Sequence, residues 1–214
     1  ELEDVVTYSG LIPGYTYTIK GELYDVATGE SIGVTGETEF VADARSGQQS
    51  VTFTVNTQTL SGKTIVAFED LCSGVVIVAS HKDLSDLGQT VYVPKLGTTL
   101  TDSTTGTHSA ILGSGITLND VVSYDNLEVG KTYTVKGELY DVSTGNPIGV
   151  TAETEFTAES TSGNVTVEFK IDTTIFRGFT VVAFEEVYDG STLIAAHADL
   201  SDTFQTVYIP DFQT

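Results

Sequence analysis

The chain has 214 residues, of which 30 are acidic and 9 are basic, so its formal charge is −21. Such a charge repels phosphate groups, which argues against nucleic acid or an anionic membrane surface as a partner. Hydrophobic residues make up 40% of the chain, which is enough to form a core. Cys72 is the single cysteine, so no internal disulfide can form, and no apolar run is long enough to insert into a membrane.

The predicted elements are β-strands throughout. Alternating or β-branched runs occur at residues 15–26 (YTYTIKGELYDV), 51–57 (VTFTVNT), 64–70 (TIVAFED), 132–142 (TYTVKGELYDV), 165–171 (VTVEFKI) and 180–186 (TVVAFEE). Turn signals separate them, among them ATGE, RSGQ, STGN and TSGN. No segment shows a helical period. This spacing predicts all-β, immunoglobulin-like antiparallel sandwiches.

The chain contains the same unit twice. Residues 1–98 align with residues 117–214 without a gap, and more than half of the aligned pairs are identical. A period of this length is typical of free-standing domains rather than of solenoid repeats. The sequence therefore predicts two tandem domains, residues 1–93 and residues 94–214.

The two predicted domains differ at their first strand. The strand-like segment KLGTTLTD, residues 95–102, precedes the second unit, and nothing equivalent precedes the first. We therefore expect domain 1 to lack its opening strand and domain 2 to be complete. Residues 210–214 (PDFQT) match residues 94–98 (PKLGT), which predicts that they begin a further repeat of a longer array.

Several polar side chains fall on apolar faces of the predicted strands. Because strand residues alternate between faces, Thr98 groups with its apolar neighbours at 96 and 100, while Thr99 and Thr101 take the other face. The same reasoning places further polar residues inside each domain: Asp120, Glu185 and Gln205 in domain 2, and Asp4, Glu69 and Gln89 in domain 1. Burying carboxyl groups costs several kcal/mol unless they are paired or share a proton. Their recurrence in both domains predicts a site.

A motif just before the last strand adds a histidine. The segments HKDLSDLGQT (81–90) and HADLSDTFQT (197–206) place His81 and His197 at a fixed distance before the glutamines. A Thr hydroxyl held against a Gln amide in a dry core reacts intramolecularly, which is worth roughly 7–11 kcal/mol at ideal geometry. A protonated carboxyl would stabilise the oxyanion, and an imidazole would transfer the protons. The product would be an ester linking the first and last strands.

The VAFE segments, the HxDLxDxxQT motif and the opening strand LGTTLTD resemble the ester-bond domains of Gram-positive surface adhesins, also called T-Q ester-bond or VaFE-repeat domains. The resemblance covers nearly the whole chain. It implies an autocatalytic bond from Thr98 to Gln205, assisted by Glu185, His197 and Asp120. The matching residues of domain 1 are Asp4, Glu69, His81 and Gln89, which lack a Thr partner, so we expect that domain to be uncrosslinked.

The resemblance also implies a biological setting. Such domains form stalks of extracellular, cell-wall-anchored adhesins, so the expected partners are neighbouring repeats of the same polypeptide. A host-surface ligand would bind through a distal domain outside these residues. The chemistry is a single self-cross-linking event rather than enzymatic turnover. It needs no cofactor and no metal.

Two other readings remain open at the level of sequence. Lys20 and Lys136 occupy matching positions in YTIKGELYD and YTVKGELYD, which allows an isopeptide domain with a Lys–Asn or Lys–Asp bond. The acidity also allows a calcium-binding or carbohydrate-binding module, although DLSD lacks the spacing of an EF-hand loop. His108 has no counterpart in the first unit and is interpreted as a loop residue.

Overall fold

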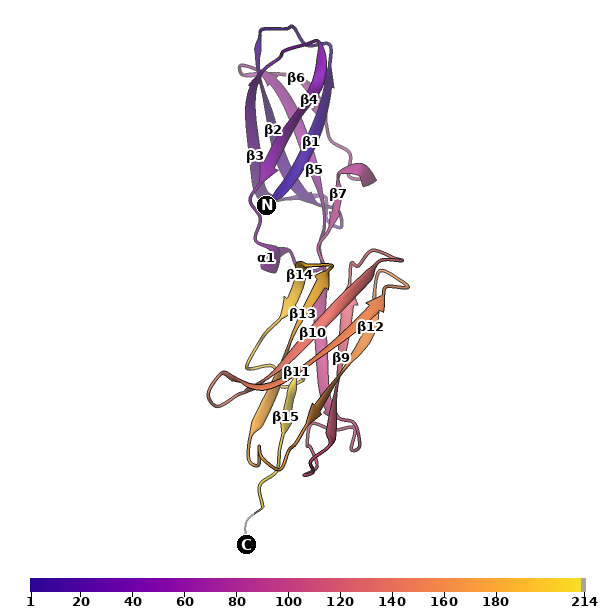
Figure 1. The fold of residues 1–214 in the computed structure, drawn as a ribbon. Coiled ribbons are helices and arrows are strands. Elements are labelled where there is room, and N and C mark those ends of the chain that lie inside the picture. Colours follow the sequence, from indigo (N-terminus) through magenta and orange to yellow (C-terminus); the bar gives the residue numbers. More distant parts are fainter. Residues whose placement is uncertain (213–214) are drawn as a thin grey trace. The chain divides into compact units, whose positions relative to one another are not determined.

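The computed structural model describes residues 1–212, with the backbone alone for Thr57 and Gln58. The chain divides into two compact units, Glu1–Val93 and Pro94–Thr214, each of which is built from antiparallel strands (Figure 1). Helix is confined, within the described part, to the single turns α1 (Thr57–Leu60) and η1 (Leu87–Gln89). The predicted all-β sandwich fold is confirmed. Gln213 and Thr214, the end of the predicted further repeat, lie outside the described residues.

Unit 1 places a five-stranded sheet against a two-stranded one. The larger sheet has the order β3-β2-β5-β6, with β7 also pairing with β5, and the smaller sheet pairs β1 with β4. Its strands are β1 (Leu2–Ser9), β2 (Thr16–Asp25), β3 (Glu30–Val41), β4 (Ser46–Phe53), β5 (Thr64–Ser73), β6 (Val76–His81) and β7 (Thr90–Tyr92).

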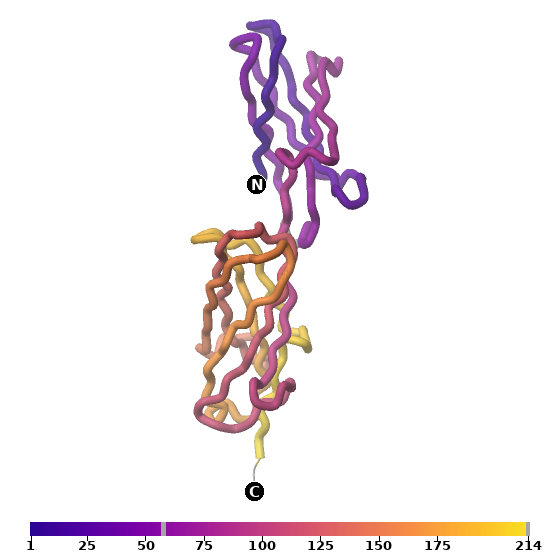
Figure 2. The backbone as a smooth tube through the Cα atoms, turned by 90° about the vertical axis from the view of Figure 1, so that its right-hand side faces the viewer, coloured from indigo at the N-terminus to yellow at the C-terminus, as the bar shows by residue number. Residues whose placement is uncertain are grey.

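Unit 2 repeats this plan with one more strand. Its larger sheet has the order β11-β10-β13-β14, with β15 also pairing with β13, and its smaller sheet has the order β12-β9-β8. The strands are β8 (Lys95–Asp102), β9 (Ile116–Asp125), β10 (Thr132–Asp141), β11 (Asn146–Thr157), β12 (Gly163–Ile171), β13 (Thr180–Asp189), β14 (Thr192–His197) and β15 (Thr206–Tyr208). In both units the chain runs in long strands joined by turns and loops (Figure 2).

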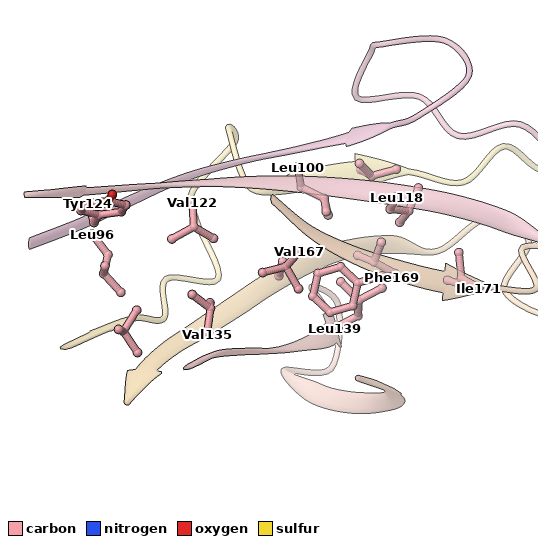
Figure 3. Close-up of a cluster of buried hydrophobic side chains, with 14 of the residues drawn as sticks. Leu96, Leu100, Leu118, Val122, Tyr124, Val135, Leu139, Val167, Phe169 and Ile171 are labelled. Carbon is pink, nitrogen blue, oxygen red and sulfur yellow. The ribbon is translucent and has the colours of Figure 1, made fainter. Parts of the chain in front are cut away.

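The core of unit 2 lies between its two sheets. Leu100, Leu118 and Val122 of the smaller sheet face Val135 and Leu139 of the larger one, and all five are fully buried (Figure 3). Phe169 of β12 fills the centre. Each strand supplies these residues at every second position, as expected for strands buried on one face.

A glycine in β10 makes room for that phenylalanine. A Cβ atom at Gly137 would clash with the buried ring of Phe169, and Gly21 stands in the same relation to Phe53 in unit 1. Gly137 lies directly across from Glu185 in the register of β10 and β13. The sheet therefore has no side chain next to Glu185 on this strand.

Strand β8 closes one side of the sandwich in unit 2. It pairs with β9 from Lys95 against Asp125 to Asp102 against Leu118, and it also packs against β14 and β15 of the other sheet. The Leu100 N–H donates to the Phe204 carbonyl at 2.9 Å. This position brings the middle of β8 against the chain that leads into β15. Over the described residues, no helix has the length and apolar character needed to cross a membrane.

Candidate cross-linking site

Thr98 of β8 and Gln205, the residue before β15, meet inside unit 2. Gln205 is fully buried, Thr98 is nearly so, and the Gln205 amide nitrogen donates a short hydrogen bond to the Thr98 hydroxyl oxygen. Thr99 on the opposite face of β8 is exposed, and Thr101 is half-buried. The alternation of β8 thus presents one of the three threonines to the glutamine.

Glu185 of β13 is the second partner of this glutamine. The Gln205 amide nitrogen lies 2.7 Å from Oε2 of Glu185, whose side chain is completely buried. Burial raises the pKa of Glu185 to about 11, and the contact with the Asp120 carboxyl adds to the rise. Glu185 is therefore a neutral acid at physiological pH.

Asp120 of β9 supplies the other carboxyl, from the opposite sheet. Its side chain is also completely buried, and burial raises its pKa above the usual range. The interaction between the two neighbouring carboxyl groups raises the pKa of Glu185 and lowers that of Asp120. The shared proton therefore resides on Glu185, which leaves Asp120 as the stronger candidate for a base.

Some polar atoms of this site have no hydrogen-bond partner of standard geometry in the described structure. They are both carboxyl oxygens of Asp120, Oε1 of Glu185 and Oε1 of Gln205. Buried acceptors are rarely left without a donor, because each one costs about 1–3 kcal/mol. A proton on Glu185 supplies a donor where Asp120 lies, so the orphaned acceptors support the neutral form of the glutamic acid.

His197, the last residue of β14, lies across from Glu185 in the strand register. Its Nε2 atom lies 3.0 Å from Oδ2 of Asp202, and its side chain is 27% exposed. Within the described part of the chain, no hydrogen bond joins this ring to Thr98 or Gln205. The structure therefore places the predicted histidine at the solvent edge of the site, held by an aspartate.

Asp202 is a residue of the site that the sequence reasoning did not select. Besides contacting His197, its Oδ1 accepts from the Phe204 N–H at 2.8 Å, and its carbonyl accepts from the Thr206 hydroxyl at 2.7 Å. These two hydrogen bonds fix the turn that places Gln205 beside Thr98. The recurrence of His and Asp five residues apart, as His81 and Asp86 in the first unit, was the available signal.

Unit 1 contains the same arrangement, without a threonine beside the glutamine among the described residues. The Gln89 amide nitrogen donates to Oε2 of Glu69 at 3.0 Å, and His81 contacts Asp86 at 2.9 Å. Burial, followed by the contact with Asp4, raises the pKa of Glu69 to about 8. Gln89 and Asp4 are only half-buried, whereas their counterparts Gln205 and Asp120 are fully buried.

The residues that allowed the isopeptide and metal-binding hypotheses are not part of the buried site. Lys20 and Lys136 are exposed: Lys20 pairs with Glu37 at 3.9 Å, and the Lys136 ammonium lies 4.8 Å from the centre of the Tyr188 ring. Neither side chain has the buried setting of Gln205. Among residues 1–212, no group of three or more acidic, His or Cys side chains is arranged to hold a metal ion. His108 lies in the loop after β8, where its Nδ1 contacts the Thr206 carbonyl at 3.0 Å.

The fold and the site define a class of protein: tandem β-sandwich modules, each with a glutamine beside paired carboxyl groups. The chain belongs to the family described as T-Q ester bond containing domain, which matches residues 1–93 and residues 94–209. The resemblance inferred from the sequence motifs is confirmed. No curated protein matches the chain.

Solved structures that are similar to parts of the chain come from different kinds of protein. A bacterial adhesin from Mobiluncus mulieris, described as containing intramolecular disulfide, isopeptide and ester bond cross-links, is 19% identical over 56% of this chain and 58% of that chain, with a TM-score of 0.45. A glycosyl hydrolase family 2 member from Bacteroides cellulosilyticus is 8% identical over 97% of this chain and 28% of that chain, with a TM-score of 0.41. The chain thus spans little more than half of the adhesin, and at these scores neither likeness bears on function.

Proposed function

We propose that unit 2 forms an internal ester between the Thr98 hydroxyl and the Gln205 side chain, and that the chain serves as a stalk segment of a bacterial surface adhesin. One observation carries the proposal. A Gln amide and a Thr hydroxyl are in contact in a buried site, beside a glutamic acid whose pKa is raised to about 11. Membership of the T-Q ester bond containing domain family supports it.

The reaction needs one nucleophile, one base and one acid. Oγ1 of Thr98 attacks Cδ of Gln205, and its proton passes to the Asp120 carboxylate. Glu185 gives its proton to the amide nitrogen, which lies 2.7 Å from Oε2. The C–N bond then breaks, ammonia leaves, and the proton on Asp120 returns to Glu185. Contact between the reacting groups before reaction lowers the entropic part of the barrier.

His197 and Asp202 lie at the solvent edge of this site. The imidazole is partly exposed and lies across from Glu185 in the strand register, where a positive charge on it would favour the ionised form of Asp120. We infer that it exchanges protons with water as ammonia departs. Asp202 holds the ring and shapes the turn before Gln205.

The cross-link would make unit 2 resistant to mechanical unfolding. An ester from β8 to the start of β15 joins the two sheets covalently, which the single cysteine of this chain cannot do internally. A load applied along the chain would then be borne by a covalent bond. This is the use we propose in an extracellular, wall-anchored stalk whose neighbours are further repeats of the same polypeptide.

Intact mass under denaturing conditions tests the proposal. The full chain is expected to weigh one ammonia less than its sequence mass, and a digest should contain a branched peptide carrying Thr98 and Gln205. Thr98→Val should restore the sequence mass, whereas Thr99→Val, a change of the same size on the exposed face of β8, should not.

Hydroxylamine separates the ester from an isopeptide, because it cleaves esters at mild pH and leaves amides intact. Hydroxylamine should therefore split the branched peptide into two linear peptides, one with a free Thr98 hydroxyl and one with a hydroxamate at position 205. A full sequence mass in the untreated protein, or a mass deficit that resists hydroxylamine and persists in Thr98→Val, would contradict the assignment.

A further inference from the structure

Each unit has a groove on the solvent-facing side of its larger sheet. In unit 2 the groove is lined from β10 by Glu138 and Tyr140, which alternate along the strand with the buried core residue Leu139. Its volume is about 750 Å³, and the matching groove of unit 1 has a volume of about 560 Å³. Both volumes fall in the range of about 300–1,000 Å³ that is usual for ligand sites.

The groove of unit 1 holds an ammonium group of its own chain. The Lys82 ammonium lies 2.9 Å from Oδ2 of Asp70, whose other oxygen accepts from the Ser80 hydroxyl at 2.5 Å. The pKa of Lys82 is raised, first by this contact with Asp70 and further by the charges of Tyr24 and Glu22. Unit 1 thus shows which chemical group these side chains surround.

Unit 2 lacks this lysine. The counterpart of Lys82 is Ala198, and the counterpart of Ser80 is Ala196; both alanines are exposed and line the larger groove. Two short apolar side chains therefore stand where unit 1 has a cation and a hydroxyl.

The anionic and aromatic side chains around that position are present in unit 2. Glu138 accepts from the Tyr140 hydroxyl at 3.1 Å, and the Tyr140 ring stacks on Phe184 with centres 4.4 Å apart. Glu186, the counterpart of Asp70, is exposed. Within residues 1–212, neither glutamate forms an ion pair with a Lys, Arg or His side chain. The groove therefore keeps its two negative charges open to an external cation.

Lys136 also lines the unit 2 groove, but its ammonium lies elsewhere. It is 4.8 Å from the centre of the Tyr188 ring, which does not line the groove. Its counterpart Lys20 pairs with Glu37 at 3.9 Å, while Lys82 pairs with Asp70. The position of the Lys82 ammonium is therefore distinct from that of this conserved pair of lysines.

We propose that the groove of unit 2 binds a lysine side chain of a partner polypeptide, in the position that Lys82 takes in unit 1. The ammonium contacts Glu186 and Glu138 through charge-assisted hydrogen bonds, and the alkyl stem packs on Ala198 and the edge of Phe184. A nearby aromatic face adds to the attraction for a cation. This binding is independent of the internal ester.

Two properties favour a basic polypeptide as the ligand. The formal charge of −21 attracts basic partners over a distance. The groove is also much larger than an ammonium group, which leaves room for the stem of the lysine and for the residues that flank it. Because the groove lies on the surface of the sheet, an extended segment can reach it without opening the fold.

Amide chemical shifts of the full chain, recorded during titration with the end-blocked peptide Gly-Ala-Lys-Ala-Gly, test the proposal. The shifts of residues 138, 186 and 196–198 should move, whereas those of the unit 1 groove should not. The same peptide with an acetylated lysine should bind at least about tenfold more weakly, because hydrogen bonds to a charged group are lost.

Variants of unit 2 test the contacts. Glu186→Gln should weaken binding by about tenfold. The matched control Glu155→Gln, the same change at an exposed position of β11 outside the groove, should leave binding unchanged. Ala198→Lys supplies an internal cation, as in unit 1, and should abolish binding.

A variant of unit 1 should gain binding. Lys82→Ala frees Asp70 and opens the groove, so the peptide should now also shift residues 22, 70 and 80. Lys20→Ala is the matched control: it removes the other lysine of this groove but leaves the ion pair in place, so it should create no second site.

Several outcomes would overturn the proposal. The parent chain needs no variant to decide it: absence of shifts at the unit 2 groove, or equal binding of the acetylated peptide, would disprove an ammonium site there. Equal weakening by Glu186→Gln and Glu155→Gln would reduce the binding to attraction by net charge. Undiminished binding to Ala198→Lys, or no second site in Lys82→Ala, would show that Lys82 does not mimic the ligand. An intact mass lacking one ammonia would leave the ester proposal standing in each case.

Discussion

Glu185 and Asp120 are buried carboxyl groups drawn from opposite sheets, and neither has a cationic residue as its hydrogen-bond partner. A protein that needed only stability would gain by replacing such a pair with apolar residues. Their burial becomes understandable if the groups act chemically, since a raised pKa keeps one carboxyl protonated and able to donate at neutral pH. At the scale of residues, the site therefore holds the protonated carboxyl of Glu185 next to the Gln205 amide.

Replacing Glu185 by glutamine tests whether its acidic proton is needed for ester formation. The variant keeps the size of the side chain and an oxygen for the Gln205 N–H, but it has no acidic proton to give. Ester formation should slow by about 10²–10⁴-fold, the usual contribution of a general acid. Intact mass of freshly refolded protein over time measures the rate, with circular dichroism to show that the strands form. The matched control is Glu69→Gln in unit 1, and an unchanged rate in Glu185→Gln would remove Glu185 from the mechanism.

Glu69 makes the stability of unit 1 depend on pH. Its pKa is raised to about 8 in the folded unit, against about 4.3 for an unfolded Glu. Between these values the folded unit binds more protons than the unfolded one, so the free energy of unfolding falls as pH rises. The slope is at most about 1.4 kcal/mol per pH unit, and stability from this group is complete below about pH 4.

The single cysteine allows this to be measured for unit 1 alone. Cys72 is buried in β5, so it reacts with a thiol reagent only when unit 1 opens. Urea titrations at several pH values, each read by a short labelling pulse at one fixed pH, give the slope. Glu69→Gln should flatten it, while Glu39→Gln on the exposed face of β3 should leave it unchanged. An equal slope in all three proteins would show that Glu69 does not carry the dependence.

At the scale of elements, strand alternation was enough to locate most of the structure. The segment KLGTTLTD coincides with β8, and its inward positions, 96, 98, 100 and 102, are the buried ones. This follows because a strand buried on one face has a strict period of two. The short turns α1 and η1 were not predictable in the same way, since single turns carry too few residues to show a period.

The neighbours of a side chain across space were harder to predict than its face. The contact between His197 and Asp202 depends on the turn that follows β14. In this turn Oδ1 of Asp199 accepts from the Ser201 N–H, and the Asp199 carbonyl accepts from the Asp202 N–H. A sequence pattern shows that these residues recur but not which oxygen faces the ring. The same limit applies to Glu185 and Asp120, which converge only when the two sheets are packed.

At the scale of the whole molecule, the two units are similar in sequence and fold but differ in the partners of their glutamines. Both carry a glutamine, a glutamic acid, an aspartic acid and a histidine in matching places, but among the described residues only unit 2 has a strand that presents a threonine. Gln89 and Asp4 of unit 1 are half-buried, whereas Gln205 and Asp120 of unit 2 are fully buried. Within residues 1–212 the two units therefore allow a comparison between a glutamine that contacts a threonine and one that does not.

That comparison predicts unequal stability. The Thr98–Gln205 bond would close a loop of 107 residues. In the chain-entropy treatment developed for disulfides, a loop of about this length stabilises a domain by up to about 4.7 kcal/mol. For a unit of this size, that gain corresponds to a rise in melting temperature of roughly 10–20 °C. Unit 2 should therefore melt well after unit 1 in the same scan.

Thr98→Val isolates this contribution, because it removes the nucleophile while keeping a side chain of the same shape against the core. Its unit 2 transition should drop by about 10–20 °C, whereas the unit 1 transition, followed by Cys72 labelling, should stay where it is. Thr99→Val is the matched control and should leave both transitions in place. If Thr98→Val melts like the parent chain, no covalent bond closes unit 2. Its stability would then come from packing alone.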